Sequence, residues 1–148
     1  MKITFQHTYN APREQVWTLL QDEDTLVRTL PGCKRLHLVR DGLYETELGL
    51  DVGPIKGLFE GHVEMCEQEE PTRYRLKLSG RGKPGELTAD SWVFLEDKDG
   101  KTVVTCDADA QVSGLLASVG QRVTGSVARM LLGRFFKNVE AELRRSAS

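Results

Sequence analysis

Residues 113–145 read SGLLASVGQRVTGSVARMLLGRFFKNVEAELRR, and this stretch decides the fold. Within it an apolar residue recurs at every fourth position, namely Val119, Val123, Val127, Leu131, Phe135, Val139 and Leu143. This spacing predicts one long helix. Because a step of four residues overshoots the helical repeat by about 40°, the apolar line winds around the helix, which needs a broad, curved apolar surface to cover it.

The chain before this helix supplies such a surface as strands. Residues 2–9 alternate polar and apolar side chains, and two short helical patterns follow, around residues 12–20 and 24–30. Six more alternating segments lie between residues 33 and 112, separated by turn sequences such as Asp41-Gly42. Their short connections favour antiparallel pairing. We therefore expect an α+β domain in which a curved, antiparallel seven-strand sheet covers the long helix, with two short helices after the first strand.

Composition limits the class of protein. A length of 148 residues fits a single domain over residues 1–148, and the net charge of -2 gives no reason to expect a nucleic-acid partner. The sequence shows neither a signal peptide nor a membrane-spanning stretch. Its three cysteines, Cys33, Cys66 and Cys106, have spacings that suggest neither zinc nor disulfides. We expect reduced thiols in a cytoplasmic protein.

Several short motifs carry a family resemblance. Residues 11–14 (APRE) followed by Val16-Trp17 resemble the opening of the START-like superfamily, also called SRPBCC or the polyketide cyclase/dehydrase and lipid-transport superfamily. Within it, the chain is similar to the carbon monoxide dehydrogenase G-subunit family at residues 30–33 (LPGC), 53–57 (GPIKG), Phe59-x-Gly61, 120–122 (GQR) and 135–136 (FF). Their order covers almost the whole chain.

The resemblance implies a helix-grip fold of the START/Bet v 1-like type, with an apolar cavity between helix and sheet. It also implies a role beside a molybdenum hydroxylase, in membrane recruitment or in handling quinone acceptors. We therefore expect a non-catalytic accessory protein that needs no cofactor and binds a quinone-like molecule or a lipid. Some family members carry an extra C-terminal segment suited to membrane attachment, whereas this sequence stops at Ser148. We expect a soluble carrier that touches the inner face of the membrane at most transiently.

The inner face of the sheet and the apolar side of the helix predict the ligand site. Small inward residues such as Gly61 and Ala89 would leave volume under the helix. The expected ligand-binding residues are Leu26, Leu30, Tyr44, Leu48, Phe59, Val63, Tyr74, Leu76, Ala89, Ser91, Val119, Val123 and Val127. Gly53, Pro54 and Gly57 suit a mobile gate at one end of the sheet, closed by the short helix around Leu26 and Leu30; a simple bend of the sheet explains them equally well.

Two other functions remain open at this stage. A small cyclase, dehydratase or hydrolase would use His7 or a tyrosine as acid or base, although no triad or metal-binding pattern accompanies His7. A pure protein–protein recruitment module would use Trp92 and Phe94, whose phase places them on the outer face of the sheet. The stems of Arg75 and Lys77 covering these rings is the alternative explanation.

Overall fold

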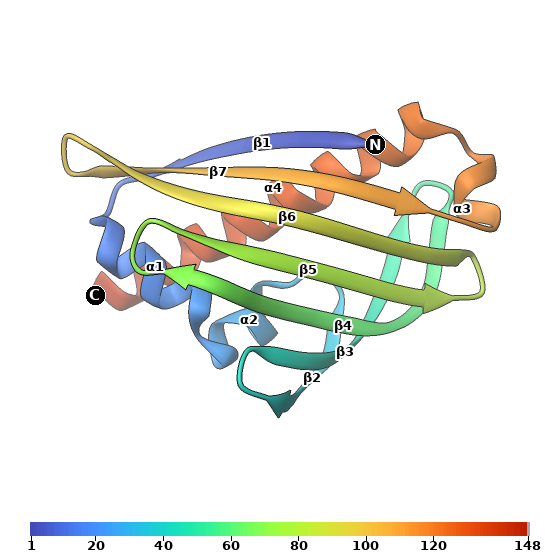
Figure 1. Ribbon diagram of the computed structural model, residues 1–148, viewed down its shortest axis with the longest axis horizontal. Coiled ribbons are helices and arrows are strands. Elements are labelled where there is room, and N and C mark those ends of the chain that lie inside the picture. The colour runs from blue at the N-terminus through green and yellow to red at the C-terminus, as the bar shows by residue number, and fades with distance from the viewer. Residues whose placement is uncertain (148) are drawn as a thin grey trace.

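The computed structural model describes residues 1–147 and shows a long helix lying across a curved sheet (Figure 1). The elements follow one another as β1 (Lys2–Tyr9), α1 (Arg13–Gln21), α2 (Glu23–Thr29), β2 (Cys33–Arg40), β3 (Leu43–Val52), β4 (Ile55–Glu69), β5 (Arg73–Gly82), β6 (Gly85–Lys98), β7 (Lys101–Val112), α3 (Leu115–Ser118) and α4 (Gln121–Ala147).

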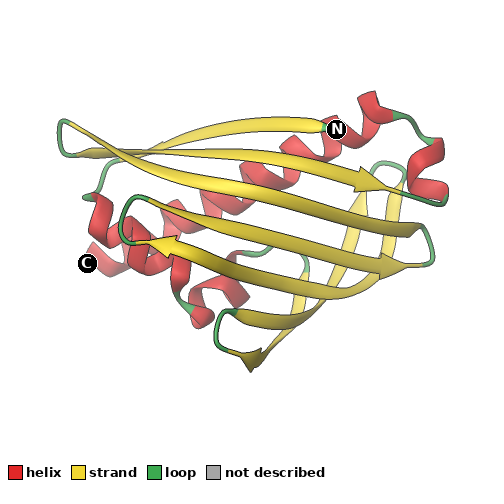
Figure 2. Ribbon diagram, viewed as in Figure 1, coloured by secondary structure: helices red, strands yellow, loops and turns green. Residues whose placement is uncertain are grey.

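All seven strands belong to one antiparallel sheet of order β1-β7-β6-β5-β4-β3-β2. The register matches the alternation of the sequence, because Tyr44, Val63, Leu78 and Ala89 are successive partners across β3 to β6 and share the inner face. Figure 2 shows α4 running behind the sheet, with α1 and α2 near one end and α3 at the other. The expected helix-grip architecture is confirmed.

The apolar core has two parts. The larger cluster joins α1, α2 and the C-terminal half of α4 to the sheet, and includes Tyr9, Trp17 and Phe136. The smaller cluster lies toward the α3 end and consists of Val52, Ile55, Phe59, Leu116 and Val127, with Leu50, Val112 and Leu131 packed against it. The long helix therefore contacts two separate apolar regions of the sheet.

The prediction of one helix over residues 113–145 was wrong at its start. Residues 115–118 form the separate helix α3, and α4 begins only at Gln121. Between them Gly120 has φ +88°, a left-handed conformation that interrupts a right-handed helix and that glycine adopts without strain. The four-residue apolar spacing continues through this glycine, so spacing alone does not show the break.

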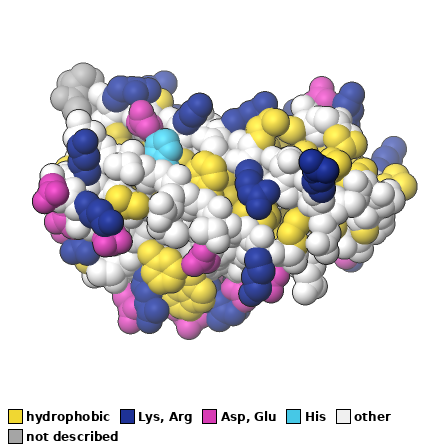
Figure 3. Space-filling view, turned by 90° about the horizontal axis from the view of Figure 1, so that it is seen from above, with side chains coloured by type: hydrophobic (Ala, Val, Ile, Leu, Met, Phe, Trp, Pro, Cys, Tyr) yellow, Lys and Arg dark blue, Asp and Glu magenta, His cyan; other side chains and the backbone are white. Residues whose placement is uncertain are grey.

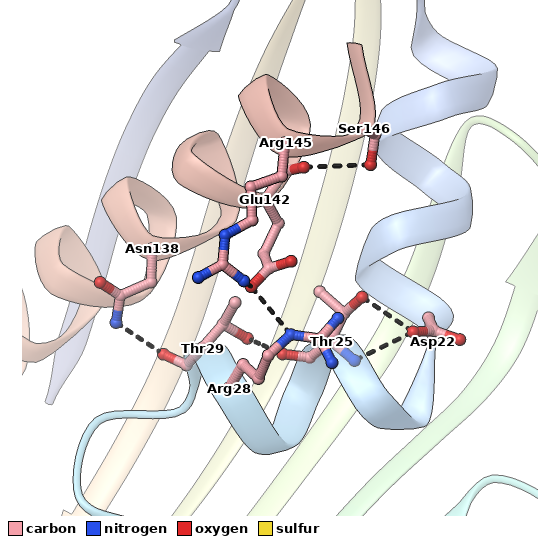
Figure 4. Close-up of polar contacts among 8 residues, drawn as sticks. All are labelled: Asp22, Thr25, Arg28, Thr29, Asn138, Glu142, Arg145 and Ser146. Atoms are coloured by element: carbon pink, nitrogen blue, oxygen red, sulfur yellow. Dashed lines mark hydrogen bonds and ion pairs between the residues drawn. The ribbon is translucent and has the colours of Figure 1, made fainter. Parts of the chain in front are cut away.

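Polar contacts tie α2 to α4 (Figure 4). The Arg28 Nε donates to Glu142 Oε1 at 2.9 Å, and the Asn138 Nδ2 donates to the Thr29 carbonyl oxygen at 3.0 Å. Asp22 caps α2 by accepting a hydrogen bond from the Thr25 backbone N–H. Because Glu142 is buried, loss of Arg28 would expose its charge to a poorly solvated site. These contacts fix α2 against the long helix.

Candidate functional site

The inner face of the sheet is loosely covered between the two core clusters. Small residues follow one another there, with Gly61 opposite Gly80 and Ala89 opposite Ala110. All four are only half-buried although they share the face on which α4 lies, and none belongs to either cluster. Leu48 and Leu87 are half-buried on the same face. This stretch is where side-chain volume is lowest beneath the helix.

The two inner-face glycines differ in what they permit. A Cβ added at Gly80 would meet only Leu87 side-chain atoms, the nearest at 3.6 Å, which is ordinary van der Waals contact. A Cβ added at Gly61 would overlap the carbonyl oxygen of Ser79 in the neighbouring strand. Gly61 therefore allows β4 and β5 to approach closely, whereas Gly80 leaves space under the helix.

The structure divides the predicted ligand residues into three sets. Leu26, Tyr44, Val63 and Tyr74 are buried in the larger cluster, and Leu30 and Leu76 pack against it. Phe59 and Val127 are buried in the smaller cluster. The remaining residues are the half-buried Leu48, Ala89 and Val119, the buried Ser91, and Val123, which is 37% exposed. A single site holding all of them is not formed.

A pocket of about 430 Å³ lies at the α3 end, and it brings one predicted ligand residue, Val119, beside one predicted gate residue, Pro54. Its walls come from the β3–β4 turn, the β5–β6 turn and α3, with Lys56, Lys83, Pro84, Leu115, Leu116 and Ser118 as the other lining residues. Leu116 also belongs to the smaller core cluster. The floor of this pocket is therefore continuous with apolar contacts beneath α4.

The partner of the predicted gate is α3 and not α2. Gly53 and Pro54 form the turn between β3 and β4, and Gly57, with φ +140°, lies against Pro84 of the next hairpin turn. Leu26 and Leu30, which the sequence suggested as the closing segment, pack in the larger cluster near the other end. Sequence reasoning missed Lys83, Pro84 and Leu115 in this site, because only the fold brings the three segments together.

A larger groove of about 510 Å³ crosses the outer face of the sheet and contains none of the predicted ligand residues. The backbone around Gly61 and Gly80 forms its floor. Its sides are polar, with Glu60, Arg81 and Glu86 along one row and Glu45, His62, Ser79 and Thr88 along the other. Such a lining does not match an apolar ligand.

The polar groups expected to orient a ligand have different environments. Burial raises the pKa of the Tyr74 hydroxyl, whose ring meets Trp17 edge-on, and no side chain or carbonyl among residues 1–147 is hydrogen-bonded to it. Burial also raises the pKa of Tyr44. Ser91 is hydrogen-bonded to Cys106, a thiol whose pKa burial raises to about 11. Tyr74 is thus the inward hydroxyl that stays protonated and available.

His7 has a structural environment. Its Nε2 lies 2.7 Å from Glu140 Oε2 on α4, and its ring stacks on Phe136 with centroids 6.1 Å apart. The hydrogen bond with His7 holds the pKa of Glu140 below its usual range. These contacts join β1 to the long helix and account for an inward-phased histidine on an apolar face.

Trp92 and Phe94 lie on the outer face, as their phase predicted, with ring centroids 6.5 Å apart. The guanidinium groups of Arg73 and Arg75 stand 5.0 and 5.9 Å from the Trp92 ring centre. Arg75 is held there by Asp90 and Glu67. Both rings are half-buried under this cover.

Two searches of the described part of the chain returned nothing. No helix in it combines the length and apolar character needed to cross a bilayer. No group of three or more His, Cys, Asp or Glu side chains within residues 1–147 is placed to hold a metal ion.

Comparison with known proteins places the chain in a family. A conserved protein from Geobacillus kaustophilus superposes with a TM-score of 0.95 at 30% identity, over 99% of this chain and 97% of that one. A START superfamily protein from Mycobacterium smegmatis (TM-score 0.74, 13% identity, 97% of each chain) and Ara h 8.0201 (0.71, 15%, 98% of each) share the fold. No curated protein matches the sequence. Residues 6–144 match the sequence model for the carbon monoxide dehydrogenase G-subunit (CoxG), so the chain belongs to that family, within the START-like superfamily.

Proposed function

We propose that this protein is a non-catalytic accessory protein that binds a hydrophobic molecule, quinone-like or lipid, between α4 and the sheet. The ligand serves a molybdenum-containing oxidoreductase of the carbon monoxide dehydrogenase type, or the protein recruits that enzyme. Family membership and the START-like fold suggest the hydrophobic-ligand-binding accessory role. The choice of ligand and the partner enzyme are parts of the proposal.

One observation carries the proposal: the stretch of small, half-buried residues that separates the two core clusters. Gly80, Ala89 and Ala110 face the helix without filling the space beneath it. An apolar chain placed there would replace water against Leu48 and Leu87. Each buried CH₂ group contributes about 0.8 kcal/mol, so a few prenyl or acyl segments are enough for tight binding.

The α3 end supplies a route to this space. Leu116 takes part both in the pocket and in the smaller core cluster, which includes the predicted ligand residues Phe59 and Val127. Left-handed glycines, Gly114 and Gly120, flank α3, so this short helix can rotate without strain in its neighbours. Movement of α3 would open the space, whereas the polar contacts between α2 and α4 hold the other end closed.

The environment of His7 supports a non-catalytic role over the enzyme alternative. A general base needs a free imidazole nitrogen directed at substrate. Here Nε2 is engaged by Glu140, and the ring is stacked on Phe136. The mechanism that remains is removal of the ligand from water and its release at the α3 end.

Native mass spectrometry tests the proposal. The purified protein is incubated with a bacterial lipid and quinone extract, and we expect a discrete added mass. A variant carrying Gly80→Leu and Ala89→Leu fills the space and should lose that mass, because both side chains project under the helix. Gly61 is unsuitable for this purpose, since any side chain there collides with the backbone at Ser79.

The matched control changes the adjacent residues on the same two strands. Ser79→Leu with Thr88→Leu adds similar apolar volume on the exposed outer face. This control should retain the added mass. Absence of any retained mass in the folded wild-type protein, or equal loss in both double variants, would contradict binding beneath α4.

A further inference from the structure

The pocket at the α3 end combines an apolar floor with positive charge at its rim. Pro54, Pro84, Leu115 and Val119 give its lining an apolar character, and Leu116 continues it into the smaller core cluster. Leu115 is 68% exposed, which is unusual for a leucine next to an apolar pocket. A ligand chain seated here would cover this side chain.

Two lysines line the same pocket, one on each hairpin turn. Lys56 has a weak partner, since its Nζ lies 3.7 Å from Asp51 Oδ1 and both side chains are largely exposed. Lys83 has no ion-pair partner in the described chain. The neighbouring Arg81 and Glu86 neutralise each other at 2.9 Å. Pairing therefore leaves the rim positively charged.

The surface around this end has the same character. Arg122, exposed in the first turn of α4, adds a further positive charge three residues beyond Val119. In the view from the β1 edge, hydrophobic side chains lie among Lys and Arg toward the right-hand end, and fewer Asp and Glu appear there than on the left (Figure 3). A cation in the first helical turn opposes the helix dipole, so its position does not serve helix stability.

From this juxtaposition we infer that the pocket binds the anionic head group of a single-chain amphiphile, carboxylate or phosphate, between Lys56 and Lys83. The apolar tail passes over Leu116 toward the space beneath α4. This inference rests on the proposed function and narrows its ligand class. A neutral quinone ring would leave both ammonium groups unused, whereas an anion pairs with them at the solvent edge without burying a charge.

Isothermal titration calorimetry with decanoate, decyl phosphate and decanol tests the head group, because these probes share one tail. We expect both anions to bind more tightly than decanol by roughly three- to tenfold, as expected for solvent-exposed ion pairs. The double variant Lys56→Gln and Lys83→Gln should lose this preference and leave decanol affinity unchanged. Preference between decanoate and decyl phosphate then identifies a fatty-acid or a phospholipid source.

Salt and a matched variant separate a specific site from general attraction. The anion preference of the wild type should fall with added salt, and that of the double variant should not. The control Lys101→Gln with Lys137→Gln removes two exposed lysines elsewhere and should keep the wild-type preference. Equal losses in the two double variants would overturn the inference.

The outcomes also distinguish this inference from the proposed function. Equal binding of decanol and both anions would overturn the anionic head group and leave a carrier of neutral ligands standing. Binding of none of the three probes, together with no retained mass from the lipid and quinone extract, would overturn both.

Discussion

At the scale of single residues, two buried tyrosines illustrate how a hydroxyl serves either folding or binding. The Tyr9 hydroxyl donates to the carbonyl oxygen of Phe136 at 2.8 Å, and this bond links β1 to α4. The Tyr74 side chain is also buried, but its hydroxyl is hydrogen-bonded to no residue of the described chain. Burial raises the pKa of both hydroxyls, so each stays protonated at neutral pH.

Replacing each tyrosine with phenylalanine should therefore have different effects. Tyr9→Phe leaves the Phe136 carbonyl without its partner and should lower the free energy of unfolding by about 1–2 kcal/mol. Tyr74→Phe should change it by less than about 0.5 kcal/mol and reduce affinity for a ligand with a hydrogen-bond acceptor. Urea denaturation and calorimetry measure the two effects. Equal destabilisation by both substitutions would show that Tyr74 has a structural partner.

Glycines mark what sequence predicts at this scale. Alternation correctly placed Gly61 and Gly80 on the inner face and suggested that both leave volume there. The structure separates them, because β4 and β5 approach closely beside Gly61. Backbone distance between strands depends on how the whole sheet bends, which no local pattern encodes.

At the scale of elements, the strands were predictable and the start of the long helix was not. Period-two alternation and short turns identified seven strands, since one face of each strand is buried. The apolar spacing from Val119 to Leu143 likewise predicted α4. It did not predict the break at Gly120, because a glycine within a helical pattern fits both a continuous helix and a left-handed turn.

Alanine substitution should distinguish the glycine of the break from a glycine of the helix. Gly133 lies inside α4, where an added Cβ meets the Phe5 ring at an ordinary 3.6 Å, so Gly133→Ala should stabilise the fold by roughly 0.5–1 kcal/mol. Gly120→Ala should destabilise it by about 1–2 kcal/mol, because φ +88° strains an L side chain. Thermal and urea unfolding provide the comparison. Stabilisation by Gly120→Ala would mean that α3 and α4 join into one helix in solution.

At the scale of the whole molecule, the sheet separates two surfaces with different chemistry. Its inner face and the α3 end carry the candidate ligand site, which depends on three segments far apart in sequence. Its outer face carries the Trp92–Phe94 stack beneath Arg73 and Arg75. Sequence phase assigned each residue to its face, but only the fold shows that the pocket opens beside α3. Ligand binding and partner recruitment are therefore separable by substitution.

The outer stack is suited to protein contact, because tryptophan and arginine are frequent among residues that dominate interfaces. We expect Trp92→Ala to weaken association with a molybdenum-containing carbon monoxide dehydrogenase-type enzyme at least tenfold, in line with loss of a central aromatic contact. Surface plasmon resonance measures this effect. Thr88→Ala, an exposed change on the same strand and face, serves as the control. Unchanged association of Trp92→Ala would exclude the stack as the recruiting surface, whereas loss of association in the Gly80→Leu/Ala89→Leu variant would show that recruitment requires the ligand.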